Sequence, residues 1–255
     1  MLCSSRIFIF LLTLSTIHIA CSDDEERFEQ ISKLRTLGVK SNKVASAPST
    51  VSTEETVSLE IVVSFPNGVI NELSAVPFVE ENSSTLALPV LLELSETAIS
   101  EESFGPLTIA TITANLKVPT FDFSNAPINK LSLRYGLEVL AENGDKERIV
   151  GNYVIYPPNS NELSWQAPNI VITAPNSANF SGSGADKVTI SAELRERQIE
   201  ESYRIGWFAS AGKIKNRRAL NSDWEELAGI REKTLIVTAR GRSSGAFTYQ
   251  ALSYE

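Results

Sequence analysis

The side chains that most often do catalysis or bind metals are almost absent from this 255-residue chain. It has one histidine, His18, one methionine, Met1, and two cysteines, Cys3 and Cys21. Beyond residue 21 the chain therefore has no Ser-His-Asp or Cys-His pair for nucleophilic catalysis, and no histidine or cysteine ligands for zinc, copper or non-haem iron. Chemistry there would have to come from carboxylates, lysine, serine or tyrosine.

Sequence motifs for cofactors are absent as well. The chain has no Gly-x-Gly-x-x-Gly run, no Gly-x4-Gly-Lys-Ser/Thr run and no Asp-x-Asp-x-Asp-Gly loop. The segment 181–184 (SGSG) looks superficially like a phosphate loop, but without a following lysine or helical pattern a flexible turn is favoured. We predict no cofactor and no metal site. A catalytic carboxylate pair stays open, because an acidic chain offers many pairs and no spacing selects one.

The first twenty residues have the composition of an export signal. Arg6 gives a short positive region, residues 7–12 (IFIFLL) are apolar, and residues 13–20 continue apolar with small hydroxyl side chains. This stretch is too short to span a bilayer comfortably, and the acidic run after it does not extend it. We predict that residues 1–20 are a signal peptide.

Cys21 directly follows that segment. Ile19-Ala20-Cys21 resembles the end of a bacterial lipobox, which implies cleavage before the cysteine and attachment of a diacylglycerol to its thiol. The small Ala20 fits this pattern, whereas His18 stands where an aliphatic residue is usual. A lone cysteine in an exported protein cannot form an internal disulfide. We expect lipidation of Cys21; the alternative is ordinary secretion after a small-x-small cleavage site.

The residues after Cys21 bear on sorting. Resemblance to sorted lipoproteins of didermal bacteria implies that Ser22 permits transport to the outer membrane, where Asp at that place would retain the protein at the inner membrane. A secreted or periplasmic location is the alternative. Residues 21–33 are charged and polar, and we expect them to form a tether to the membrane.

The charge of the chain excludes general nucleic-acid binding. Removal of residues 1–20 takes away one arginine, which leaves 22 basic against 31 acidic side chains, a net charge of −9. Residues 51–130 carry eleven acidic and two basic side chains, whereas residues 163–255 carry ten acidic and twelve basic ones. The basic half indicates either ordinary solubilising charges or a surface for a partner.

Beyond the tether the sequence alternates with the period of β-strands. In the first half, the alternation predicts strands at 57–65, 86–94, 107–118, 131–141 and 148–156. In the second half, it predicts strands at 170–173, 188–194, 203–210, 234–240 and 246–254. Asn143-Gly144 predicts a tight hairpin turn, 157–161 (PPNSN) a linker, and 223–230 a single helical turn.

Short strands separated by turn residues indicate a sandwich or barrel. We predict an all-β chain with two immunoglobulin-like β-sandwich modules in tandem, at residues 34–160 and 161–255. The signal peptide and the short tether precede them.

The segments 34–43, 55–63, 203–214 and 234–255 are similar to immunoglobulin-like modules of uncharacterised bacterial surface lipoproteins. Trp207, Gly212, Trp224 and the turn at 240–245 occupy the places of the structural residues of those modules. No cysteine pair flanks Trp207, so the resemblance is not to antibody domains. It implies a fold and a location, and no activity.

Tryptophan and basic residues of the second half are the candidates for a ligand surface. Trp207 lies inside an alternating strand and is expected in the core. Trp224 follows Asp223 in an expected loop and is the better surface candidate, with a lid over the sandwich end as the alternative. The predicted ligand surface combines Trp224, Lys213, Lys215, Arg217 and Arg218.

These features predict a non-enzymatic envelope protein, anchored through its lipid, that binds a partner or spaces a module from the membrane. Its partner would be an envelope protein or an anionic glycan. The acidic module is expected nearer the membrane. The alternative is a carboxylate-dependent glycan hydrolase of the cell envelope.

Overall fold

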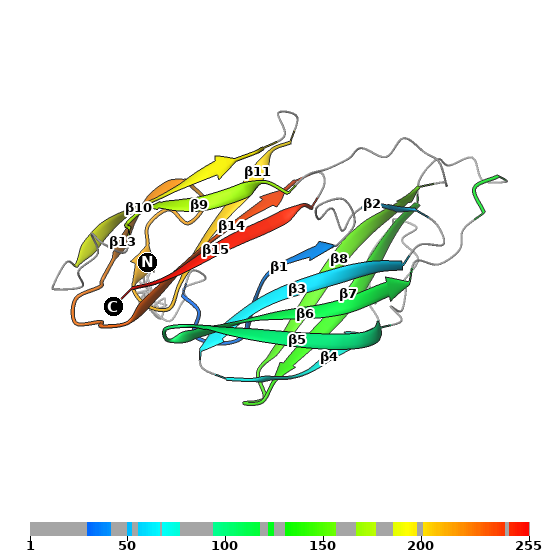
Figure 1. Ribbon diagram of the computed structural model, residues 1–255, viewed down its shortest axis with the longest axis horizontal. Helices are drawn as coiled ribbons and strands as arrows, with labels where there is room; N and C mark the ends of the chain where they lie inside the picture. The colour runs from blue at the N-terminus through cyan, green and yellow to red at the C-terminus, as the bar shows by residue number, and fades with distance from the viewer. Residues whose placement is uncertain are drawn as a thin grey trace, which may run out of the picture.

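The computed structural model describes residues 30–41, 50–52, 56–66, 68–76, 94–117, 122–124, 131–156, 167–176, 186–197, 201–242 and 245–254. Every regular element in these ranges is a β-strand (Figure 1), so the predicted all-β class is confirmed. No helix that could cross a membrane occurs in these ranges. The signal segment, Cys21, the SGSG segment and the strand predicted at 86–94 lie outside them.

The first half of the chain forms two four-stranded sheets. The first inner sheet has the order β1 (Arg35–Ser41), β3 (Thr56–Pro66), β6 (Leu107–Lys117) and β5 (Leu94–Phe104). The first outer sheet has the order β2 (Thr50–Ser52), β8 (Lys146–Tyr156), β7 (Leu131–Ala141) and β4 (Ile70–Val76). All neighbours are antiparallel except β2 and β8. Alternate side chains of the two sheets enclose an apolar core that includes Leu59, Ile61, Val63, Ile112, Leu137 and Val139.

The second half repeats this arrangement with shorter strands. The second outer sheet has the order β12 (Lys213–Ile214), β13 (Asn221–Glu225), β10 (Lys187–Arg195) and β9 (Asn169–Ala174). The second inner sheet has the order β11 (Tyr203–Ala209), β14 (Lys233–Gly241) and β15 (Phe247–Tyr254). Trp207 is fully buried between these sheets, which confirms its predicted place in the core.

The hairpin predicted at Asn143-Gly144 is confirmed. It joins β7 to β8, and the backbone N–H of Ala141 donates to the carbonyl oxygen of Asp145 over 2.9 Å. Gly144 has φ = 89°, a left-handed conformation that glycine adopts without steric cost. The Asn143 side chain accepts a hydrogen bond from the Asp145 backbone N–H.

The helical turn predicted at 223–230 is wrong at its start. Residues 221–225 form β13, which pairs with β10 in the register Val188↔Trp224. The alternation of Trp224 inward with Asp223 and Glu225 outward is that of a strand. The sequence prediction also missed β1, β2, β4, β5 and β12.

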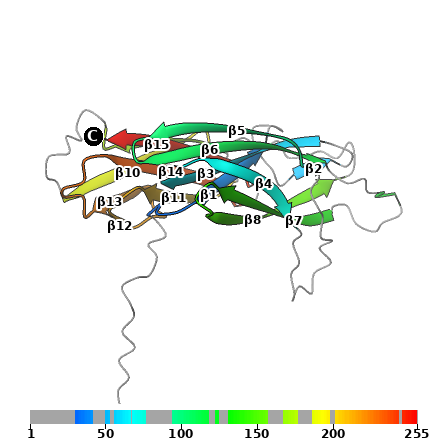
Figure 2. The same ribbon diagram turned by 90° about the horizontal axis from the view of Figure 1, so that it is seen from below.

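The two inner sheets pack against each other through the faces turned away from the two sandwich cores. This third apolar cluster takes residues from both halves of the chain: Ile31, Leu37, Val62, Leu107, Ile109, Ile236 and Phe247, flanked by Phe104, Phe208, Tyr249 and Ala251. The sandwiches therefore lie side by side with β15 next to β1 and β5 (Figures 1 and 2). In the described part of the chain, four sheets enclose three apolar clusters.

The burial patterns of two central strands, β3 and β14, reflect this packing. The burial of β3 alternates from Thr56 to Glu60, and both of its faces are then buried from Ile61 to Phe65. β14 is buried on both faces from Lys233 to Ala239. A strand buried on both faces loses the simple alternation of a half-exposed strand.

The contact between the inner sheets is close. An ideal Cβ on Gly38 would lie 2.3 Å from the ring of Phe247, and one on Gly105 would lie 2.6 Å from Oγ of Ser253. The Thr234 hydroxyl donates to the carbonyl oxygen of Phe104 across the same contact. Side chains larger than hydrogen at Gly38 are therefore excluded by the second sandwich.

The chain enters the fold at the second sandwich. Gln30 forms a parallel bridge with Ala209 at the end of β11, and the Ile31 N–H donates to the Ala209 carbonyl over 2.9 Å. Ile31 is 1% exposed in the cluster between the sandwiches. Within the tether predicted for residues 21–33, Ile31 is packed, whereas Ser32 and Lys33 are exposed and residues 21–29 lie outside the described part. The domain limits 34–160 and 161–255 stay predictions, since residues 157–166 lie outside the described part.

We expect Gly38→Ala to lower the free energy of unfolding by about 1–3 kcal/mol, because the added methyl group overlaps the Phe247 ring. In a Phe247→Ala background the same substitution should cost much less. Denaturant unfolding of the four proteins of this cycle measures the coupling. Equal costs in the two backgrounds would show that the inner sheets do not meet at this point.

Candidate functional site

Trp224 does not lie on the surface. Its side chain is 0% exposed, its indole N–H donates to the Ala211 carbonyl over 2.8 Å, and its ring meets Tyr254 edge-on at 6.2 Å. The prediction of Trp224 as part of a ligand surface is therefore wrong. Strand pairing with Val188 turns the indole into the core of the second sandwich, where its N–H finds a partner.

The four predicted basic residues follow one another along the second outer sheet. Lys213 lies on β12 opposite Glu225, and Lys215, Arg217 and Arg218 lie in the segment between β12 and β13. The side chains of Lys213, Lys215 and Arg218 are exposed, and Arg217 is half-buried. The structure thus keeps the predicted cations together and removes the aromatic side chain from among them.

The segment that carries these cations is fixed to β11. The backbone N–H of Trp207 donates to the Arg217 carbonyl over 3.0 Å, and its indole N–H donates to the Ala219 carbonyl over 2.7 Å. The Asn216 N–H donates to the Ser222 hydroxyl over 2.8 Å. Trp207 therefore ties the segment between β12 and β13 to β11 through two hydrogen bonds.

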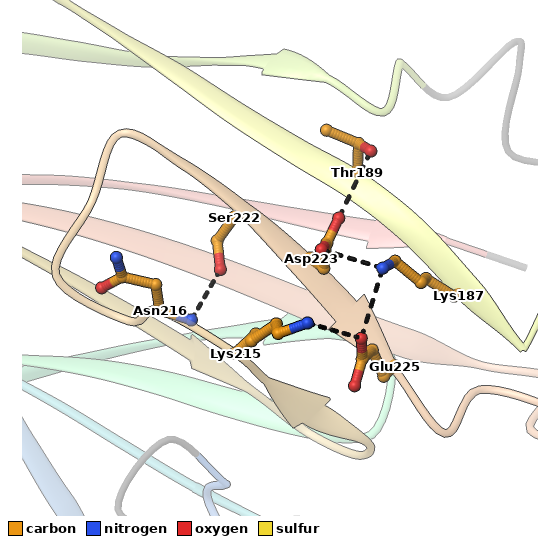
Figure 3. A network of polar contacts seen from close by, with 7 residues as sticks. All are labelled: Lys187, Thr189, Lys215, Asn216, Ser222, Asp223 and Glu225. Carbon is orange, nitrogen blue, oxygen red and sulfur yellow. Dashed lines mark hydrogen bonds and ion pairs between the residues drawn. The ribbon is translucent and has the colours of Figure 1, made fainter.

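Acidic side chains of β13 lie among the lysines (Figure 3). Nζ of Lys187 on β10 is 2.9 Å from Asp223 and 3.4 Å from Glu225, and Nζ of Lys215 is 4.0 Å from Glu225. The hydrogen bond between Lys187 and Asp223 lowers the pKa of Asp223 and raises the pKa of Lys187. Both groups therefore stay charged over the physiological range, and this face carries alternating charges rather than a uniform positive potential.

Several other carboxylates bond to backbone amides at sheet edges. Asp145 and Glu147 accept from the N–H groups of Leu34 and Thr36 at 3.4 and 3.5 Å, and Glu101 accepts from the Ile70 N–H at 2.9 Å. Glu101 lies on β5, and its bond to the first residue of β4 links the two sheets of the first sandwich. These contacts cover strand edges that would otherwise present free N–H groups.

No group of three or more His, Cys, Asp or Glu in the described ranges could hold a metal ion. Cys21, the predicted lipidation site, lies outside those ranges. What the second outer sheet offers is a rigid, polar, mixed-charge surface, which can form ion pairs and hydrogen bonds with a complementary surface.

No protein-family model matches the sequence, and no curated protein is similar to it. Among solved structures, the fibronectin(III)-like modules of Clostridium thermocellum CbhA match over 85% of this chain and 92% of theirs, at 13% identity and a TM-score of 0.29. Drosophila N-cadherin EC1-3 matches over 80% and 78%, at 12% identity and a TM-score of 0.27. The titin domains z1z2 in complex with telethonin match over 88% and 96%, at 13% identity and a TM-score of 0.21. Similarities this low carry no functional information for this chain.

Tyr254 ties the last strand to the second outer sheet. It is 3% exposed, and its hydroxyl donates to the Pro175 carbonyl over 2.9 Å. Burial raises the pKa of Tyr254 to about 12. The neutral phenol is therefore strongly preferred in the folded protein, whereas in the unfolded chain it ionises near pH 10.

We expect the protein to lose stability between pH 10 and 12, because over that range the unfolded chain releases the Tyr254 proton and the folded protein retains it. The loss attributable to this group is on the order of 2 kcal/mol, allowing for some solvent screening. Tyr254→Phe should be about 1 kcal/mol less stable at neutral pH, through the lost hydrogen bond, and should lose less above pH 10. Urea unfolding at stepped pH measures both, and a parallel decline of wild type and variant would contradict the assignment.

Proposed function

We propose that this protein is an exported lipoprotein, anchored in the cell envelope through Cys21, that binds another envelope protein and does no catalysis. The apolar segment ending in Ile19-Ala20-Cys21 supports the anchor. The lack of histidine, methionine and further cysteine beyond residue 21 supports a role without catalysis. Ser22 supports a place in the outer membrane, if the host has one.

Side-by-side packing of the sandwiches supports binding rather than spacing. A spacer gains reach when modules follow one another end to end. Here the inner sheets share the apolar cluster around Val62, Ile236 and Phe247. The sandwiches therefore overlap, and the molecule spans a shorter distance than two modules joined end to end. The same packing gives a rigid body with two outer sheets, which suits a protein that presents a surface.

The outer face of β10 and β13 is the surface that we propose for the partner. Lys187, Asp223, Glu225 and Lys215 form a fixed pattern of both signs there. A protein surface can match such a pattern charge by charge, whereas an anionic glycan would meet the carboxylates of Asp223 and Glu225 as well as the lysines. This observation favours an envelope protein over a glycan.

The glycan-hydrolase alternative has no comparable support. Glu101, Asp145 and Glu147 each accept a hydrogen bond from a backbone N–H, and Asp223 and Glu225 pair with lysine. These carboxylates have structural partners, and nothing in their arrangement singles out an acid and a nucleophile.

The anchor is tested by Cys21→Ser. We expect the wild-type protein to start at residue 21 with added acyl mass and to sediment with membranes, and the variant to remain uncleaved or to appear in the soluble fraction. Cys3→Ser is the matched control, because Cys3 lies in the predicted signal peptide and its loss should change neither result. A wild-type intact mass without acyl groups on residue 21 would overturn the lipoprotein assignment.

The binding surface is tested by photo-crosslinking in intact membranes with a benzoylphenylalanine in place of Thr189, which lies beside Asp223 on this face. We expect a discrete adduct that weakens in high salt and in Lys215→Glu, because salt screens exposed charges. Val150, an exposed residue of the first outer sheet, is the control position. Equal adducts at both positions, or none at Thr189, would contradict the proposed surface.

A further inference from the structure

We infer that the end of the molecule where Gln30 meets Ala209 faces the lipid bilayer, so that both sandwiches stand side by side on the membrane instead of one above the other. This rests on the proposed lipid anchor at Cys21. It differs from the expectation from sequence that the acidic module lies nearer the membrane than the second module.

The first step is the point of attachment. The Ile31 N–H donates to the Ala209 carbonyl, and the Ile31 side chain is buried between the sandwiches. Three residues later Leu34 is buried in the core of the first sandwich. A chain attached here holds both sandwiches at once, so the length between anchor and body is counted from Cys21 to Gln30.

The second step is the maximum length of the tether between Cys21 and Gln30. Nine residue steps separate Cys21 from Gln30, and a fully extended chain covers at most about 30 Å over that length. A strand of nine residues, such as β14, is itself roughly 30 Å long. The attached end therefore stays within about 30 Å of the bilayer, and only a fully extended tether would let the body turn over, so the attached end lies on the membrane side.

The third step is to identify the two ends of each sandwich. In the second sandwich, Leu235 pairs with Ala209 near the start of β14, and Gly241 pairs with Tyr203 at its other end. In the first sandwich, the Leu34 N–H donates to Asp145, which brings the β7–β8 turn to the attached end. The start of β3, at Thr56, lies at the opposite end of that sandwich, since Arg35 pairs with Ser64.

Four exposed positions therefore distinguish the two arrangements. Arg231 and Asn143 lie near the attached end, one in each sandwich, and Arg242 and Thr56 lie at the far ends. Side-by-side sandwiches place the first two near the bilayer and the last two away from it. Stacked sandwiches, with the first one proximal, would place Asn143 and Thr56 nearer than either arginine.

The experiment couples residues 21–255 through the Cys21 thiol to a maleimide phospholipid in vesicles of neutral lipid. A donor dye is attached to an azide-bearing amino acid at one of the four positions, and an acceptor dye is carried by lipid headgroups. We expect a larger loss of donor fluorescence at Arg231 and Asn143 than at Arg242 and Thr56. Equal losses at Arg231 and Arg242, or the larger losses at Asn143 and Thr56, would overturn the inference.

The packing of Ile31 is tested in the same vesicles with Ile31→Asp and its matched control Ser32→Asp, an exposed neighbour that receives the same charge. Ile31→Asp should reduce the loss of donor fluorescence at Arg231, because the attachment then begins at Leu34 in the first sandwich and the tether is longer by four residue steps. Ser32→Asp should leave that loss unchanged. If Ile31→Asp does not fold, the four labels on the unaltered chain still decide the question. Because the coupling is chemical, the result is independent of whether cells acylate Cys21, so a failed anchor and a failed orientation give different results.

Discussion

The packing of the two inner sheets against each other is the contact on which the rest of this structure depends. It requires β3 and β14 to be apolar on both faces, and it explains why Gly38 has no side chain next to Phe247. It also creates the site in which Ile31 is buried. If the sandwiches were separated, each would expose an apolar patch to water, which is energetically costly. The patch would include Val62 on the first sandwich, and Ile236 and Phe247 on the second. The two halves therefore behave as one body.

The strands were largely predictable because each sandwich buries one face of most of its strands. Burial of one face produces the period-two alternation that marked 131–141 and 203–210, and Asn143-Gly144 fixed the hairpin between β7 and β8. Trp207 was predictable for the same reason. The packing of the inner sheets was not predictable, because Val62 and Ile236 stand at positions that alternation assigns to the outer face. The periodicity of apolar residues indicates whether one or both faces of a strand are buried, but it does not indicate which element packs against each face.

The candidate site shows a second limit of linear sequence. Lys213, Lys215, Arg217 and Arg218 form a basic run along the chain, and the run alone predicts a positive surface. The structure brings Lys187 on β10 beside Asp223 on β13, a neighbour set by strand pairing rather than by spacing along the chain. Trp224 was misplaced because a strand of five residues between turns is too short to show its alternation clearly. Asp145 and Glu147 accept hydrogen bonds from the backbone N–H groups of Leu34 and Thr36, and each pair is 111 positions apart in the sequence.

The position of Gln30 and Ile31 has a consequence for how the protein matures. The N-terminal segment is synthesised first, yet the residue that Gln30 pairs with, Ala209, belongs to a strand near the other end of the chain. Contacts between residues so distant in sequence form late, because the entropy of closing the intervening loop must be overcome first. The site of Ile31 is formed by residues of both sandwiches, so its burial is complete only once the two have met.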